Sequence, residues 1–438
     1  MHNNRLRSLV LLVVLSFLCF VPPASIDDAY ATPSGANLNQ LVQSMLDQVD
    51  PASVYTYTGD LSGAWEVSID DQPYTIYTRH ALSGEPIVKA AQYLSQFYED
   101  IGLQVENDYF SFQGQTLTNI VAQKEGSVFP ERIFLITSHY DDVPVTGLAP
   151  GADDNASGTS AVMMTAEILS QYDFGCTLRF VNFGAEEYGM IGSKDYAHQA
   201  YCSGEEILGV INLDMIAWNT PESTTAMDLH TLSSVHGSNE LATVFQEVVA
   251  DYNLDLIPEL ADPVTTRSDH SSFWKYDYPA ILVTEYWGDF NPNYHSVNDD
   301  LGSIGDFSYY TDMIKAGLGT MALTGCLVDQ GWGTLSGQVV DSLSKNPVPG
   351  ASVWLHNTEW DYTWFTRSDH NGFYQFSALA GWHKLSVDGV GYSRGDYGVS
   401  IVQNQAQVID IEIEPTQETV LYLPLSANIR HAPPPGCP

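Results

Sequence analysis

Positive charge is scarce in this chain. Its 438 residues include 16 Lys and Arg against 54 Asp and Glu, which gives a formal net charge of -38. Nucleic acid and anionic membranes repel so acidic a surface, so neither is expected as a partner. The acidity can attract cations or keep an exported protein soluble, and it does not identify a substrate.

A long apolar run is also lacking. Residues 8–21, SLVLLVVLSFLCFV, are fewer than the roughly 20 that a transmembrane helix needs. Arg5 and Arg7 precede this run and the small-residue site Ala29-Tyr30-Ala31 follows it, which is the pattern of a secretory signal peptide. We expect residues 1–31 to be removed and the protein to be secreted and extracellular, or else periplasmic or cell-surface associated, without stable membrane insertion. A retained N-terminal anchor is the alternative.

Five short polar motifs stand out against this background. A catalytic zinc ion binds imidazole and carboxylate groups and keeps one position open for water. A pair of such ions needs one shared carboxylate and about two further ligands for each ion. The motifs are SHYDD at 138–142, GADDNASG at 151–158, AEE at 185–187, LDM at 213–215 and YHS at 294–296. The residues in them that meet this demand are His139, Asp154, Glu187, Asp214 and His295.

Two carboxylates have special roles in this interpretation. Asp154 is the expected bridge, because it sits in a glycine-flanked loop that can aim one side chain between two ions. Glu186 is left over as the proton carrier that amide hydrolysis requires. Adjacent side chains of an extended segment point in different directions, so Glu187 can reach a metal while Glu186 faces the reacting water.

In order and content, the motifs resemble the M28 family of zinc exopeptidases over roughly residues 77–325. The resemblance implies a peptidase with two Zn2+ per chain, acting on peptides or proteins, with the five ligands above and Glu186 as general base. Asp141 matches the family's orienting carboxylate. In a strand, Asp141 would lie on the same face as His139 and hold its second ring nitrogen. The resemblance also implies a cis bond between Asp154 and Asn155.

Apolar runs precede the motifs and indicate the fold class. They lack the alternation of a half-exposed strand, which predicts strands buried on both faces, and helical spacing over 157–172 and 189–200 predicts helices between them. The expected fold is α/β, a mostly parallel mixed sheet flanked by helices, with the ligands at carboxyl ends of strands. The runs are IFLITSHYD at 133–141, LRFVNFGAEE at 178–187, VINLDM at 210–215 and AILVTEY at 280–286.

The pattern changes after Gly331. Short alternating runs divided by turns predict a β-sandwich, and the run from Gly337 to Tyr392 resembles the carboxypeptidase regulatory-like domain. That domain is expected to stabilise or attach the enzyme, and binding a surface or matrix polymer is the alternative. The predicted division is 1–31 signal peptide, 32–76 N-terminal extension packing on or preceding the core, 77–330 di-zinc peptidase domain, 334–415 sandwich and 416–438 tail.

Cysteines are few. Of the 5 in the sequence, Cys19 would leave with the signal peptide. In an exported chain the remaining four can pair. Cys176 opens a predicted strand and Cys202 lies before the next one, so we favour a structural disulfide between them at the amino-terminal edge of the sheet. A nucleophilic role is less expected, because neither lies near the carboxylate cluster.

Several further residues are candidates for supporting roles near the metals. Asp269 and His270, in SDHSSFW, are expected to contact ligands or be structural rather than bind metal. Tyr286 and Tyr294 belong to an aromatic loop before His295 that can line a substrate pocket or pack on itself.

The leading functional interpretation is a secreted di-zinc aminopeptidase, in which a metal-bridging hydroxide attacks the peptide bond and Glu186 carries the proton. A metallocarboxypeptidase or dipeptidase on the same scaffold is the alternative, and a basic cluster for the substrate carboxylate would favour it. A glutaminyl cyclase is less expected, because the full ligand set is present. A non-catalytic surface-binding protein with a relic metal domain is the alternative from another class.

Overall fold

The structure, a computed structural model, describes residues 36–144, 147–220, 224–328, 331–357, 362–416 and 437. The predicted signal peptide and nearly all of the predicted tail lie outside these ranges. Within them, no helix combines the length and the apolar character needed to cross a bilayer.

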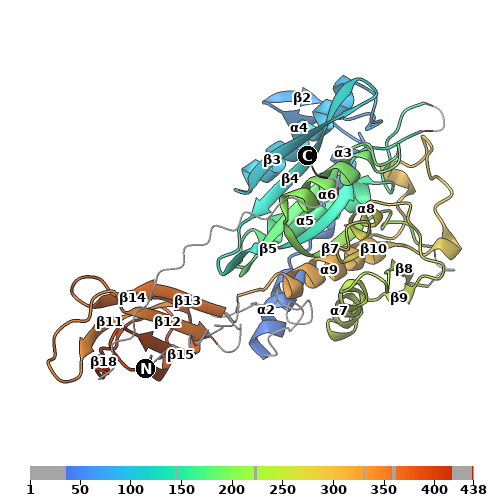
Figure 1. Cartoon of the computed structure of the whole chain (residues 1–438). Coiled ribbons are helices and arrows are strands. Elements are labelled where there is room, and N and C mark those ends of the chain that lie inside the picture. Colours follow the sequence, from blue (N-terminus) through green and yellow to red (C-terminus); the bar gives the residue numbers. More distant parts are fainter. Residues whose placement is uncertain are drawn as a thin grey trace, which may run out of the picture.

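An eight-stranded mixed sheet forms the centre of the larger domain (Figure 1). Its four central strands, β6, β5, β7 and β10, run parallel to one another, and the strands that flank them, β4 and β8, pair with them in antiparallel fashion. Each strand predicted before a motif is therefore present. The order is β3 (Gln104–Phe112), β4 (Gln115–Lys124), β6 (Cys176–Phe183), β5 (Phe129–His139), β7 (Glu206–Leu213), β10 (Ala280–Glu285), β8 (Ala226–His230) and β9 (Ile257–Leu260).

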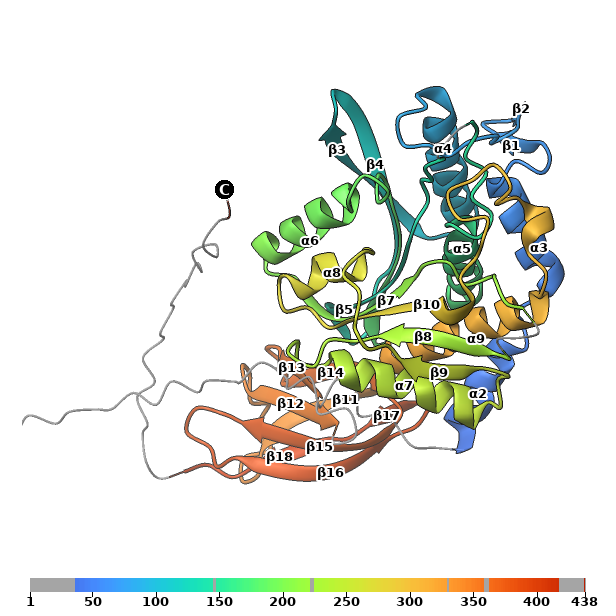
Figure 2. The same cartoon turned by 90° about the vertical axis from the view of Figure 1, so that its right-hand side faces the viewer.

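The continuous apolar runs arise because both faces of this sheet are covered. Along β5, Phe134 and Ile136 face one hydrophobic cluster, whereas Ile133 and Leu135 face another. Helices α6 and α8 cover the second face, and α3, α4 and α5 lie on the opposite side (Figure 2). The helices are α4 (Glu85–Asp100), α5 (Ala156–Leu169), α6 (Ile191–Ser203), α7 (Ser238–Asp251), α8 (His270–Trp274) and α9 (Phe307–Thr324), with short 3-10 turns η1 (Trp287–Asp289) and η2 (Leu301–Ser303).

The described part of the N-terminal extension packs into the same domain. Helix α2 (Ala36–Leu46) buries Leu38, Val42 and Met45, which recur at helical spacing, in the main core cluster. Helix α3 (Pro51–Leu61) begins at Asp50, whose carboxylate accepts the backbone N–H groups of Ala52 and Ser53. A two-stranded ribbon, β1 (Val67–Ile69) and β2 (Gln72–Tyr74), follows.

The C-terminal region is the predicted all-β sandwich. One sheet contains β14 (Phe373–Leu379), β11 (Trp332–Asp341), β17 (Ala406–Val408) and β18 (Ile411–Ile413), and the other runs β13 (Tyr362–Arg367), β12 (Ser352–Asn357), β15 (Gly381–Asp388) and β16 (Gly395–Ile401). Most neighbours are antiparallel, but β17 and β18 pair with β11 in parallel. Alternate apolar residues of the two sheets form a separate core.

The sandwich contacts the end of the eight-stranded sheet that lies away from the predicted ligands. Phe129 opens β5 and meets Tyr362 of β13 edge to face, with ring centroids 4.7 Å apart. The guanidinium of Arg132 lies 4.2 Å from the centroid of the Phe129 ring. The carboxyl ends of the central strands therefore stay clear of this contact.

The expected disulfide between Cys176 and Cys202 is wrong. Cys176 bonds to Cys326, and Cys202 bonds to Cys437. The chain after α9 returns to the start of β6, where Gly175 N donates to Cys326 O at 2.7 Å, and this brings Cys326 to Cys176. Cys202 lies in the last turn of α6 rather than in a loop, because that helix continues to Ser203.

Candidate metal centre

Five ligand candidates, far apart in the sequence, meet at one edge of the sheet. His139 is the last residue of β5, and Asp214 directly follows β7. Glu187 follows β6, Asp154 precedes α5, and His295 lies in the loop after β10. Because these central strands are parallel, their carboxyl ends share this edge, as predicted.

Asp154 lies between the two histidines. Its Oδ1 is 3.4 Å from Nε2 of His139, and its Oδ2 is 3.2 Å from Nε2 of His295. Each oxygen of this buried carboxylate therefore faces a different imidazole. That is the arrangement expected of a carboxylate shared by two ions.

The two remaining ligand candidates divide between these halves. Oδ1 of Asp214 is 3.2 Å from Nε2 of His139, and Oε2 of Glu187 is 2.9 Å from Nε2 of His295. The ligand atoms of His139, Asp154 and Asp214 lie within 4.8 Å of one another, as do those of Asp154, Glu187 and His295. The geometry thus forms two three-residue groups with Asp154 in both.

The donor set fits zinc. His139 Nδ1 lies 3.0 Å from the carbonyl oxygen of Asp141, and donation to that carbonyl leaves Nε2 unprotonated and able to bind a metal. Burial alone would raise the pKa of Asp154, but when His139 and His295 are protonated their hydrogen bonds outweigh it and hold that pKa below its usual value. A metal ion would take the place of those protons on the two Nε2 atoms. Imidazole and carboxylate are the ligands of catalytic zinc sites, and the carboxylates supply the negative charge that cations require.

Asp141 acts differently from the sequence-based prediction. Strand β5 ends at His139, so Asp141 is not on a strand, and its carboxylate stays 3.9 Å from His139 Nδ1. The main-chain carbonyl of Asp141 makes the imidazole contact instead. The carboxylate accepts the backbone N–H groups of Glu186, at 2.9 Å, and Glu187, at 3.4 Å. Asp141 therefore orients His139 through its backbone and the glutamate pair through its side chain.

Glu186 lies beside the metal ligands and is only 8% exposed. One of its oxygens lies within 4.8 Å of ligand atoms of His139 and Glu187. Burial raises the pKa of Glu186 well above its usual value; the charge of His139 opposes this, and Asp269 adds to it. A carboxyl group whose pKa is shifted toward neutrality is suited to accept and return a proton.

The loop that carries Asp154 is held by several hydrogen bonds. Asp299 accepts the backbone N–H groups of Asp153 and Asp154, each at 3.0 Å. The peptide bond between Asp154 and Asn155 is cis, as the resemblance implies. The Asn155 side chain accepts from Gly158 N at 2.9 Å and so caps α5. These contacts aim the Asp154 carboxylate into the site.

Arg79 is a supporting residue that the sequence interpretation missed. Its fully buried guanidinium donates to the carbonyls of Leu61, at 2.6 Å, Tyr140, at 2.8 Å, Gly151, at 2.6 Å, and Pro150. It thereby ties the end of α3 to the segments that lead to Asp141 and Asp154. The available signal was an arginine in a chain that has few basic residues, and the partners of this arginine are backbone atoms, which have no sequence pattern.

The other predicted supporting residues lie at different distances from the ligands. Asp269 is fully buried, and its charge acts on Glu186. His270 binds no ligand candidate; its Nε2 lies 3.1 Å from Thr265 O. Ser268, which the sequence interpretation did not single out, donates to Oδ2 of Asp214 at 2.6 Å. Its hydroxyl therefore positions that ligand.

A pocket of about 250 Å³ opens over the metal ligands. Tyr294 lines it and stacks on His295, with ring centroids 3.6 Å apart, whereas Tyr286 is not among the lining residues. Arg267 is the one basic side chain among those that line this pocket. The other lining residues beyond the ligands and Glu186 are Met215, Thr265, Ser268, Leu282, Thr284, Trp287 and Phe290.

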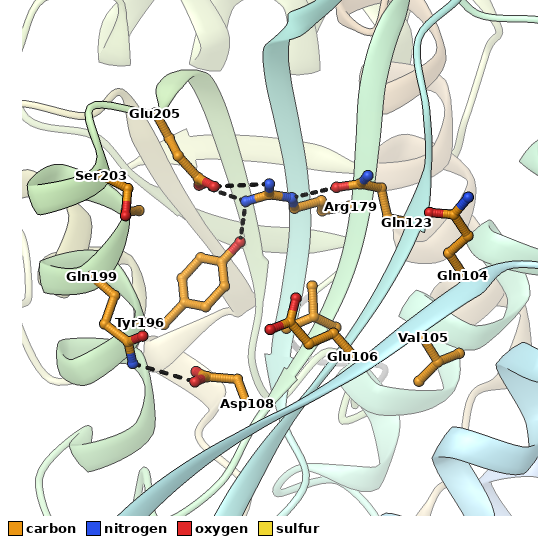
Figure 3. A pocket seen from close by; sticks show the side chains of 12 residues that line it. Gln104, Val105, Glu106, Asp108, Gln123, Arg179, Tyr196, Gln199, Ser203 and Glu205 are labelled. Carbon is orange, nitrogen blue, oxygen red and sulfur yellow. Dashed lines mark hydrogen bonds and ion pairs between the residues drawn. The ribbon is translucent and has the colours of Figure 1, made fainter. Parts of the chain in front are cut away.

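A larger pocket, of about 450 Å³, lies between β3 and α6 (Figure 3). Its arginine, Arg179, donates to Glu205 at 2.6 and 3.0 Å, to Gln123 at 2.9 Å and to the hydroxyl of Tyr196 at 2.8 Å. The guanidinium is therefore committed to its neighbours. None of the predicted ligands lines this pocket, which supports the metal edge as the functional site.

Comparison with known proteins agrees with this geometry. Residues 119–308 match Peptidase family M28, and residues 334–414 match the carboxypeptidase regulatory-like domain. A protein of Leptosphaeria maculans named "Probable zinc metalloprotease" is 28% identical over 244 residues, which cover 47% of this chain and 56% of that one. Aminopeptidase YwaD of Bacillus subtilis is 37% identical over 110 residues, or 24% of this chain and 23% of its own.

A solved structure supports the fold. The LapA aminopeptidase of Legionella pneumophila aligns with a TM-score of 0.55 at 19% identity, covering 66% of this chain and 75% of that one. The chain spans about half the length of the first curated relatives it matches. The resemblance predicted from the motifs is confirmed: the chain combines a domain of Peptidase family M28 with a C-terminal carboxypeptidase regulatory-like domain.

Proposed function

We propose that this protein is a secreted di-zinc aminopeptidase that hydrolyses N-terminal peptide bonds. The observation that carries the proposal is the position of Asp154, whose two oxygens face two different histidines. His139, Asp154 and Asp214 would hold one ion, and His295, Asp154 and Glu187 the other. When bound, zinc polarises a peptide carbonyl and lowers the pKa of water toward neutrality.

Glu186 carries the proton in this proposal. Its carboxylate accepts a proton from the attacking water and returns it to the departing amine, so one group serves as base and then as acid. Asp141 fixes the backbone of the glutamate pair, which keeps Glu186 and Glu187 in their separate positions. The pocket wall formed by Leu282, Phe290 and Tyr294 can exclude water from the reacting bond.

The names of relatives support attack at the amino end of a substrate. YwaD of Bacillus subtilis and LapA of Legionella pneumophila are both named aminopeptidases. The carboxylates that line the pocket do not decide between the two ends of a substrate, because the charge of two bound zinc ions would offset that of Asp154, Glu187 and Asp214.

Arg267 favours a second candidate, a carboxypeptidase or dipeptidase. Its exposed side chain lines the pocket and has no ion pair among the described residues. A free guanidinium can bind a substrate carboxylate through two parallel hydrogen bonds.

A single set of assays tests these proposals. Purified protein should contain about two zinc ions per chain and lose all turnover on chelation, with recovery on adding zinc. It should cleave aminoacyl-anilides and leave N-blocked peptides intact. Cleavage of only the N-blocked set would reject the aminopeptidase in favour of the second candidate, and protein that takes up no zinc would reject the enzyme altogether.

Export is the remaining part of the proposal. The pattern of residues 1–31 and the two disulfides support it, because disulfides persist in oxidising compartments. Mature protein recovered from culture medium should begin at about residue 32. Protein that stays in the cell with Met1 intact would reject export.

A further inference from the structure

The outer face of one sandwich sheet carries exposed aromatic rings. In strands β12, β13, β15 and β16, one set of alternate residues enters the sandwich core and the other set faces outward. The outward set includes Phe365, 54% exposed, and Trp382, 56% exposed, with Trp354 between their strands. We call these three rings and the outward residues around them the aromatic face.

The rings lie across the sheet. Trp354 pairs with Phe365 in the β12–β13 register, and their ring centroids are 5.6 Å apart. The guanidinium of Arg394 lies over the Trp354 ring, 5.6 Å from its centroid, so Trp354 supports its neighbours and does not offer a free ring face. Trp382 lies over Gly398 of β16, because a Cβ added to Gly398 would come within 2.8 Å of the indole. Glycine therefore leaves the space that the indole occupies. The result is a shallow surface with aromatic rings on three of its four strands.

Such exposure is unfavourable without a partner. Large apolar side chains are stabilised by removal from water, and clustered exposed rings mark interaction sites on soluble proteins. In Figure 2, β15 and β16 lie on the side of the sandwich farthest from the peptidase domain. The contact between the domains uses Phe129 and Tyr362, so it does not account for the aromatic face.

The charge of the aromatic face differs from that of the whole chain. Its basic residues Arg367, Lys384 and Arg394 outnumber its acidic residues Asp388 and Asp396, whereas the chain as a whole has a net charge of -38. Lys384 and Arg394 both pair with Asp396, at 3.2 and 3.3 Å. Arg367 has no ion pair among the described residues. This face is thus a locally basic surface on an acidic protein.

We propose that the aromatic face binds a carboxylated polysaccharide, with sugar rings stacked on the exposed rings of Phe365 and Trp382 and a uronate carboxylate held by Arg367. Sugar rings present flat C–H faces that suit aromatic rings, and guanidinium binds carboxylates through two parallel hydrogen bonds. The polar groups around the rings can bond hydroxyls. Nucleic acid fits less well than a uronate polymer, because duplex DNA carries one charge per about 1.7 Å of its axis, more than one carboxylate per sugar ring, and the acidic remainder of the chain would repel it more strongly. The site would hold the peptidase at a polymer matrix.

Binding of polygalacturonate by the full chain tests this proposal. We expect saturable binding that weakens as salt is added. The double variant Phe365→Ala/Trp382→Ala should bind roughly tenfold or more weakly, since it loses two stacking rings. Arg367→Gln should weaken binding and reduce its salt dependence. Tyr109→Ala is the matched control, because Tyr109 is 66% exposed on β3 of the peptidase domain. All variants should keep wild-type hydrolysis of small substrates.

Four outcomes would overturn the proposal. They are no binding of polygalacturonate, equal binding by the wild type and the double variant, a preference for neutral xylan over polygalacturonate, and ring-dependent binding only to phosphatidylserine vesicles. The substituted side chains are largely exposed, so their removal should leave thermal unfolding nearly unchanged. If the double variant unfolds at a clearly lower temperature than the wild type, Phe365→Ser/Trp382→Ser replaces it, and the same criteria apply.

Discussion

The two domains differ in where their charged side chains lie. At the carboxyl edge of the peptidase sheet, Arg79, Asp141, Asp154, Glu186 and Asp269 are all buried. In the sandwich, the core cluster is aliphatic and aromatic, and its charged side chains lie mainly on the outside. Burying a charge is costly unless it is paired or binds a metal. The comparison shows that the buried charges, which are energetically unfavourable, lie at the edge of the sheet where catalysis is proposed.

The largest expected effect comes from Glu186→Gln. Losing the proton carrier should lower kcat by about 10² to 10⁴, while zinc content stays at the wild-type value. The measurement is turnover of an aminoacyl-anilide with metal analysis of the same sample. Glu187→Gln is the matched control. Because Glu187 is a ligand candidate, this variant should have a lower zinc content as well as a lower kcat. Near wild-type turnover in Glu186→Gln would remove Glu186 from the mechanism.

In the sandwich core, Leu385→Ala should affect stability alone. Leu385 is fully buried, and truncating a buried leucine costs about 2 to 5 kcal/mol of unfolding free energy. The urea concentration at the midpoint of sandwich unfolding should fall. The value of kcat should not change at urea concentrations where the protein is still folded. Leu343→Ala changes a side chain that is 80% exposed, so it should alter neither the urea midpoint nor kcat. A large loss of kcat in Leu385→Ala would show that the two domains are not separable in function.

Arg79 links stability and metal binding. Arg79→Met removes the donors that hold the segments leading to Asp141 and Asp154, and residues that orient metal ligands typically contribute 10- to 100-fold in metal affinity. Arg79→Lys should rescue little, because an ammonium group cannot reach four carbonyls at once. Competition with a zinc chelator measures this effect. Arg132→Met, at the opposite end of β5, is the control, and unchanged zinc affinity in Arg79→Met would contradict the role.

The last effect is confined to acidic pH and should be close to zero at pH 7. Burial lowers the pKa of His270 to about 3. An unfolded histidine titrates near 6.5, so the stability that His270 contributes is full above that pH and falls by about 1.4 kcal/mol per unit as pH drops toward 3. His270→Gln should lack this slope in urea unfolding between about pH 4 and 7. Exposed His236→Gln is the control. Identical slopes in the wild type and His270→Gln would contradict a neutral buried imidazole.

The strands and ligand candidates were accessible from sequence because their patterns are local. The run that ends at His139 is apolar without alternation, which only a strand covered on both faces explains. The doublet of Glu186 and Glu187 was accessible in the same way, because the two proposed roles, proton carrier and metal ligand, fall on adjacent residues. By contrast, the partner of Cys176 depends on where α9 returns, and the role of Arg79 depends on carbonyl groups that every residue possesses.

The amino-acid sequence alone determined the two domains, the parallel central strands and the identity of the ligand candidates, since hydrophobic period and side-chain chemistry are written residue by residue. Tertiary structure decided how Asp141 orients His139, which cysteines pair, and which aromatic rings of the sandwich remain in water. Those features depend on main-chain atoms and on contacts between distant segments. Packing brings them together, and no local pattern encodes their distances.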